Sequence, residues 1–258
     1  MRPQDLINDI LFEFYKKFNI KHKITGDDSV GLSRYYNFRL KFIEAKPRRV
    51  LISKESIKNI FLSDHKNDIL LLLDKMKKGM DINPYQSKQS FNADYHDMLF
   101  NDWGIRHFHL NHNKQKPNDY FHIRTGNLLF AKFEGDEAYI LDVKHHKDKN
   151  VWSNTDIIRL IRNNWNHILE PYEVGSGSWY PNFNDEEIGI VRNKGYIFSI
   201  NVDDKTYMML GDGYAVSGDN MEATRLAIEV YRWIGKNLEL FEKDVETFKK
   251  QLKMRMHL

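Results

Sequence analysis

Two apolar segments decide the fold of this 258-residue sequence: LLFAKF at residues 128–133 and AYILDV at residues 138–143, which the tetrapeptide EGDE joins. Gly135 and Asp136 suit a tight turn between antiparallel strands. Hydrophobic side chains occupy both faces of this hairpin, which is typical of strands that are covered on both sides. We therefore predict a central hairpin inside a larger sheet.

Helical patterns surround the hairpin. Apolar residues recur at spacings of three and four in residues 7–18, 57–76 and 157–169, and again from residue 219 onward. Residues 35–42 alternate in part like a strand. This mixed order predicts an α+β fold with a central antiparallel sheet, β-hairpins flanked by helices and a long C-terminal helix.

The composition is that of a globular protein. The chain has 41% hydrophobic residues, 29% charged residues and no cysteine, which excludes disulfide frameworks, thiolate metal sites and cysteine nucleophiles. A loop signal predicts a mostly helical N-terminal subdomain at residues 1–82 and an α+β core with the C-terminal helix at residues 83–258. No flexible spacer separates them, so a single domain is the alternative.

The charge and hydropathy patterns bear on location. A membrane-spanning helix needs about 20 apolar residues, and no apolar run in the sequence approaches that length. We therefore expect a cytoplasmic protein without a membrane anchor. The net charge of +3 permits nucleic-acid partners without requiring them.

The densest functional segment is RHFH at residues 106–109. In a strand, the side chains of His107 and His109 would lie on one face about 7 Å apart, and that of Arg106 on the other. Imidazoles change charge near neutral pH, so such a pair provides an acid and a base.

A second segment, LDVKHHK at residues 141–147, ends the central hairpin. If the strand continues that far, Asp142, Lys144 and His146 share a face. The two histidine-rich strand ends could then meet at one edge of a sheet. Asp142 would be a carboxylate on an apolar face, which is costly unless it is paired.

Imidazoles beside lysine and arginine suit RNA cleavage by attack of the 2′-hydroxyl. A base takes the hydroxyl proton, an acid protonates the leaving oxygen, and cations stabilise the charged phosphorane. This hypothesis needs no metal and no cofactor. Its candidate catalytic residues are His107, His109, His146, Arg106, Lys144, Lys132 and Asp142.

Three other interpretations stay open. A metal-dependent hydrolase would use His107, His109, His146 and Asp142 as ligands. A non-catalytic module that binds nucleic acid or protein would use the same residues only to hold a surface together. The histidines could also be ordinary hydrogen-bonded residues at a sheet edge.

Aromatic and basic side chains recur outside these segments. Single-stranded RNA is bound by aromatic rings that stack on bases and by cations that hold phosphates. The candidate substrate-binding residues are Arg124, Arg162, Tyr120 and Trp179. We therefore expect RNA as a candidate partner, with the oligomeric state left open.

The strand, turn and basic strand end at residues 128–146 resemble the core of the RelE/ParE-type toxin ribonucleases. The resemblance implies metal-free RNA cleavage by basic and histidine or tyrosine residues, and a cognate antitoxin or regulatory protein as a partner. It covers only this hairpin, because those toxins are much shorter and lack the long helical additions. The implied role is that of a bacterial toxin or phage-defence protein.

Two further resemblances are local. The segment RNNWNH, from Arg162 to His167, is similar to the R-x4-6-H pattern of HEPN ribonucleases, whose domains are all-helical. The stretch at residues 102–165 also resembles bacterial proteins without an assigned activity, so it implies none.

Overall fold

The computed structural model describes residues 2–21, 30–177, 179–208 and 210–258. The chain forms two compact units, and each is assembled from separated segments. The helical unit consists of Met1–Phe42, Gln89–His96 and Tyr214–Leu258, and the sheet unit consists of Ile43–Lys88 and Asp97–Gly213. The boundary that the sequence suggests near residue 82 falls inside the first segment of the sheet unit.

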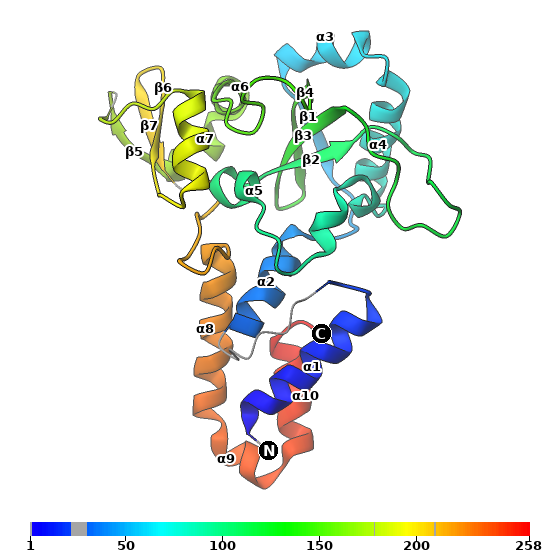
Figure 1. Cartoon of the computed structure of the whole chain (residues 1–258), viewed down its shortest axis with the longest axis vertical. Coiled ribbons are helices and arrows are strands. Elements are labelled where there is room, and N and C mark those ends of the chain that lie inside the picture. The colour runs from blue at the N-terminus through cyan, green and yellow to red at the C-terminus, as the bar shows by residue number, and fades with distance from the viewer. Residues whose placement is uncertain (1, 22–29, 178, 209) are drawn as a thin grey trace. The chain divides into compact units, whose positions relative to one another are not determined.

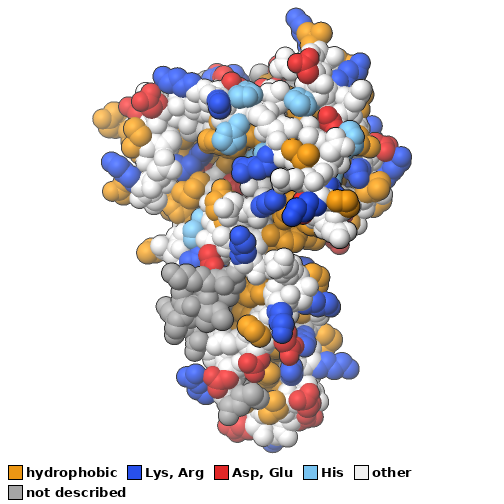
Figure 2. Space-filling model, turned by 45° about the vertical axis from the view of Figure 1, so that its right-hand side comes forward, with side chains coloured by type: hydrophobic (Ala, Val, Ile, Leu, Met, Phe, Trp, Pro, Cys, Tyr) orange, Lys and Arg blue, Asp and Glu red, His pale blue; other side chains and the backbone are white. Residues whose placement is uncertain are grey.

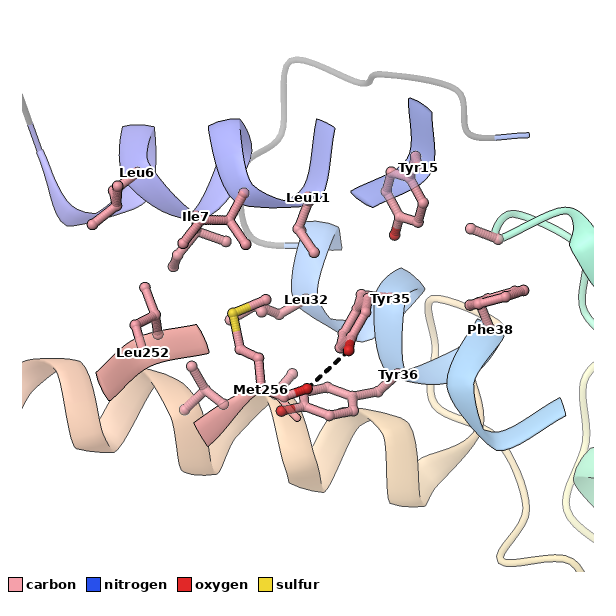
Figure 3. Close-up of a cluster of buried hydrophobic side chains, with 14 of the residues drawn as sticks. Leu6, Ile7, Leu11, Tyr15, Leu32, Tyr35, Tyr36, Phe38, Leu252 and Met256 are labelled. Carbon is pink, nitrogen blue, oxygen red and sulfur yellow. Dashed lines mark hydrogen bonds between the residues drawn. The ribbon is translucent and has the colours of Figure 1, made fainter. Parts of the chain in front are cut away.

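Helices build the helical unit (Figure 1). They are α1 (Pro3–Lys17), α2 (Gly31–Lys41), α8 (Met221–Lys236), α9 (Leu238–Lys243) and α10 (Val245–Arg255). Their apolar faces form one core (Figure 3), in which the Tyr35 hydroxyl donates a hydrogen bond of 2.8 Å to the carbonyl of Met256. The strand-like interpretation of residues 35–42 is wrong. Tyr35 and Phe38 lie three positions apart, and both rings pack against Phe14 of α1, which fixes the helical period.

The C-terminal region is helical, as the sequence predicts, but three helices replace one. The first interruption is at Asn237, and the second is at Asp244, whose side chain accepts a hydrogen bond from the Thr247 amide at 3.0 Å. An Asp side chain that caps a new helix competes with continuation of the preceding one. The apolar stripe therefore continues while the helix axis changes.

A four-stranded sheet forms the centre of the sheet unit. Its strands are β1 (Arg49–Ile52), β2 (Ile105–His109), β3 (Asn127–Glu134) and β4 (Glu137–His145), in the order β1-β4-β3-β2. The predicted hairpin is confirmed as β3 and β4, which pair antiparallel. The α+β class is also confirmed, but the sheet is mixed because β1 pairs parallel with β4.

Apolar clusters cover both faces of this sheet. One cluster joins Leu129 and Ile140 to α3 (Lys54–Leu62) and α4 (Lys66–Lys78). The other joins Leu128 and Phe130 to α5 (Met98–Trp103) and α6 (Asp156–Trp165). The hairpin is central and buried on both sides, as its sequence predicts.

A second sheet of three antiparallel strands completes the sheet unit, in the order β5-β7-β6. Its strands are β5 (Glu173–Ser176), β6 (Ser199–Val202) and β7 (Lys205–Met208), and helix α7 (Asp185–Asn193) precedes β6. Short 3-10 helices occur at η2 (Asn83–Tyr85), η3 (Lys88–Phe91), η4 (Asn166–Ile168) and η5 (Glu170–Tyr172). Among the described residues, no helix has the length and apolar character to cross a membrane.

Candidate functional site

The paired histidines lie on β2, an edge strand of the four-stranded sheet. His107 pairs with Phe130 of β3 and His109 pairs with Leu128. The two imidazoles share a face, and their ring centroids are 6.4 Å apart. Because side chains alternate along a strand, Arg106 lies on the opposite face of β2 from the two histidines. Its guanidinium lies 4.5 Å from the centroid of the Phe100 ring.

Trp152 connects His146 to the paired histidines. The centroid of its ring lies 4.9 Å from that of His107 and 5.2 Å from that of His146. His146 is exposed, whereas His109 is only 3% exposed. We call His107, His109 and His146 the histidine cluster, and it extends from the surface into the interior. Figure 2 shows histidine side chains among lysine and arginine side chains on the surface of the sheet unit.

The segment that leads into β3 brings Arg124 to the cluster. Nδ1 of His109 lies 3.2 Å from the backbone nitrogen of Thr125 and 3.3 Å from its carbonyl oxygen. The Thr125 hydroxyl accepts a hydrogen bond from the Leu110 amide at 2.8 Å, which fixes this segment against the end of β2. Arg124 is exposed, and its charge acts on both His107 and His109.

Burial is the largest influence on the pKa values of His107 and His109, which we call the two inner imidazoles. It lowers the pKa of His109 to about 4, and the positive charges of His107, when protonated, and of Arg124 act in the same direction. Burial also lowers the pKa of His107, with Asp97 opposing this effect and His146 and Arg124 adding to it. Both inner imidazoles are therefore neutral at pH 7, as a general base must be.

Two ring nitrogens of the cluster are buried without a hydrogen-bond partner among the described residues: Nδ1 of His107 and Nε2 of His109. A buried polar atom without a partner costs free energy, and most such atoms in folded proteins are paired. These two nitrogens therefore have unused hydrogen-bonding capacity.

Asp142 and Lys144 form a separate pair. Lys144 Nζ lies 3.3 Å from the Asp142 carboxylate, which also accepts a hydrogen bond of 3.2 Å from Asn59 of α3. Leu141 has no cross-strand partner, because β3 and β4 shift register at this point. The bulge directs the Asp142 carboxylate toward α3, where its buried charge is paired.

Lys132 is buried at the other end of β3, opposite Ile105. Its ammonium donates hydrogen bonds to the carbonyls of Trp103 at 3.3 Å and Leu210 at 3.2 Å. These contacts tie the end of α5 to the segment that follows β7. Neither Lys132 nor Arg106 is therefore directed at the histidine cluster.

Of the four predicted substrate-binding residues, only Arg124 lies at the cluster. The Tyr120 hydroxyl donates to Asp81 at 2.6 Å, and Arg162 donates to the Val202 carbonyl at 3.0 Å. Trp179 is 46% exposed, and its ring lies beside Gly175.

The two residues of the HEPN-like segment have different partners. Arg162 also pairs with Asp203 and Asp204 in the turn between β6 and β7. Nε2 of His167, in η4, lies 3.5 Å from the Tyr139 hydroxyl. The structure thus gives each of them a contact with the protein itself.

The alternative metal set is not assembled. Within the part of the chain that the structure describes, no three histidine, aspartate or glutamate side chains are grouped so as to hold a metal ion. Asp142 is bound to α3 and Lys144, while the histidines lie around Trp152.

Two residues near the site, Trp152 and Arg192, are not predicted from the sequence. Trp152 follows His146 closely in the chain, and this proximity could have indicated it, but the packing of its ring depends on the fold. Arg192 of α7 donates a hydrogen bond to the Trp152 carbonyl and forms a buried ion pair with Asp102. Only the tertiary structure brings Arg192 near this segment, and no sequence pattern indicates it.

Comparison with known proteins identifies no relative of this chain. Neither a protein-family model, nor a curated protein, nor a solved structure matches the chain.

Proposed function

We propose that the protein is a metal-independent endoribonuclease of the toxin or phage-defence type, with the histidine cluster as its active site. One observation carries this proposal: the half-buried imidazole of His107 and the buried imidazole of His109, each with a nitrogen that has no described partner, lie together with Arg124 and the exposed His146. Neutral imidazoles beside a cation are the groups that phosphodiester cleavage by a 2′-hydroxyl requires.

The arrangement gives each residue a role. His107 takes the proton of the 2′-hydroxyl as its oxygen attacks phosphorus. The bond between phosphorus and the 5′-oxygen breaks, and His146, which is exposed, protonates that oxygen. The products are a 2′,3′-cyclic phosphate and a 5′-hydroxyl. His109, through its contact with Thr125, positions Arg124 beside the phosphate.

Arg124 replaces the cations that the sequence suggests for the phosphorane. Arg106 is held between the rings of Phe100 and Phe133, and Lys132 is held by backbone carbonyls. Lys144 is paired with Asp142. An exposed guanidinium is free to form two parallel hydrogen bonds with a phosphate.

A non-catalytic module that binds a protein is the second candidate. On α3, Phe61 is 53% exposed and Leu62 is 72% exposed. Lys66 Nζ lies 4.9 Å from the Phe61 ring centroid, which adds a cation to this apolar surface. Such a surface suits a cognate antitoxin or regulatory protein. This observation is compatible with an enzyme that is held inactive by its partner.

RNA cleavage by the purified chain tests the first proposal. A 20-nucleotide single-stranded RNA and its 2′-deoxy counterpart are incubated with the protein in excess EDTA. We expect cleavage of the RNA alone, with 2′,3′-cyclic phosphate ends, because the 2′-hydroxyl is the nucleophile. Removing the general base typically costs about 100-fold to 10,000-fold in rate, and this loss is expected for His107→Phe.

The control is His65→Phe, the same change at a histidine of the loop before α4. It should cleave like the unaltered chain. Cleavage of the 2′-deoxy strand, inhibition by EDTA, or full activity of His107→Phe would each contradict the proposed mechanism. No cleavage of any RNA would favour the protein-binding module.

A further inference from the structure

The helical unit contains a cavity of about 380 Å³ that is not part of the histidine cluster. Helix α1 provides one wall with Ile10, Glu13, Phe14 and Lys17, which recur at the spacing of a single helix face. The opposite side comes from α2 and α10, and the last two residues complete the lining. This volume lies within the range of small-molecule sites, about 300–1,000 Å³.

The floor of the cavity is aromatic. The ring centroids of Phe14 and Phe18 are 4.9 Å apart, and Phe18 remains 49% exposed. Lys17 Nζ lies 5.3 Å from the centroid of the Phe18 ring, so a cation already sits over this aromatic surface. A half-exposed ring in a concave site is a surface on which another flat ring can stack.

The rim of the cavity is positively charged. Three cationic side chains, Lys17, Arg39 and Lys253, face one carboxylate side chain, Glu13, so cationic side chains predominate. Lys253 Nζ lies 3.8 Å from the Glu13 carboxylate. Across the described ranges, neither Lys17 nor Arg39 has a carboxylate oxygen within 4.0 Å, so both are available to an anion.

We propose that this cavity binds a nucleotide, with the base against Phe18 and Phe14 and the phosphate between Lys17 and Arg39. A flat ring joined to an anion matches an aromatic floor with a cationic rim. An acyl chain would need apolar surface on all sides, whereas five of the nine lining residues are charged residues or histidine. The nucleotide is either free or part of a single strand.

Calorimetric titration of the full chain at low salt tests this proposal. The probes are adenosine 5′-monophosphate, a ten-nucleotide oligo(dA), decanoate and inorganic phosphate. We expect the monophosphate to bind with a Kd below about 1 mM. Binding of oligo(dA) that is more than about tenfold tighter and that Arg39→Gln weakens would identify a strand as the source, and equal binding would identify the free nucleotide.

Variants of exposed residues connect this binding to the cavity. Arg39→Gln should weaken binding of the monophosphate about tenfold, because it removes a charge-assisted contact. Glu13→Gln should tighten it, because the only carboxylate side chain of the lining is lost. The matched control is Arg232→Gln, the same change on the exposed surface of α8, with an expected effect below about twofold.

Four results would overturn the proposal. They are tighter binding of decanoate than of the monophosphate, equal binding of inorganic phosphate, an Arg39→Gln effect no larger than that of Arg232→Gln, and no binding at all. Binding of the monophosphate and cleavage of RNA are separate measurements. Failure of this proposal is therefore distinguishable from failure of the ribonuclease proposal.

Discussion

The two ends of β2 differ in how their buried ionisable groups are paired. Before the strand, Asp102 pairs with Arg192, and the side chains of these residues are 7% and 4% exposed. Near the first residue of the strand, the Lys132 ammonium is bound by two carbonyls. Further along, His107 and His109 each keep a buried nitrogen without a described partner.

This difference separates charged groups that hold the fold through matched partners from neutral imidazoles that have unused hydrogen-bonding capacity. A charge with a matched partner stabilises the structure only as long as both partners remain. An unpartnered imidazole already costs stability in the free protein. Substitution should therefore be harmful at the first end of β2 and nearly neutral for folding at His107.

The largest expected effect is at Asp102. Asp102→Ala should lower the free energy of unfolding by about 3–5 kcal/mol, because it leaves the Arg192 charge buried and unpaired. Urea denaturation measures this change. Lys149→Ala is the control, since Lys149 and Glu186 form an exposed pair at 3.5 Å, and it should cost less than about 1 kcal/mol. Equal losses of unfolding free energy in Asp102→Ala and Lys149→Ala would contradict a structural role for the buried ion pair.

The pH dependence of stability should be next in size. The pKa of His109 is about 4 in the folded chain, against 6.5 in the unfolded chain. Between these values the unfolded chain binds a proton that the folded chain does not. The free energy of unfolding should therefore fall as the pH is lowered from 6.5 to 4, by up to about 3 kcal/mol for this residue.

Urea denaturation at several pH values measures this effect. His109→Gln removes the titrating group and should flatten the dependence within that pH window. An unchanged slope in this variant would mean that His109 is charged in the folded protein, and the two ends of β2 would then be alike.

A smaller effect is expected for His107→Phe. The new ring keeps the packing against Trp152 and Phe130 and removes the unpartnered Nδ1, so stability should change by less than about 1 kcal/mol. Thermal and urea unfolding measure this change. A loss of about 3 kcal/mol or more would identify His107 as a structural residue.

The smallest effect should come from Arg124→Gln. Arg124 is exposed, so the change in stability should stay within about 0.5 kcal/mol. Because its charge lowers the pKa of both inner histidines, the variant should raise these values. Histidine resonances followed by NMR during a pH titration measure the shift, and unchanged titration curves would place Arg124 away from the cluster.

Local patterns account for the part of the fold that could be predicted. The two apolar runs and the turn at Gly135 determine the central hairpin, and the two-residue period of a strand places His107 and His109 on one face. The same period separates Arg106 from them. These features depend on neighbouring residues, so the sequence contains them directly.

The remaining features depend on contacts between distant segments. The bulge at Leu141 directs Asp142 to α3, and no local signal marks it. Arg162 is bound by a turn about 40 residues further along the chain. The ring of Trp152 joins the cluster only because the segment after β4 folds back against β2, although β3 separates these two strands. A side chain that can form hydrogen bonds or packing contacts with several different residues cannot be matched to its partner before the fold is known.

The central claim is that the inner imidazoles are neutral and open to a substrate. Nitrogen-15 NMR of the histidine rings at pH 7, with and without an uncleavable 2′-deoxy oligonucleotide, tests it most directly. We expect one protonated and one bare nitrogen in His107 and in His109, and a shift of the His107 signals when the oligonucleotide is added. Doubly protonated rings at pH 7, or His107 signals that do not move, would contradict it.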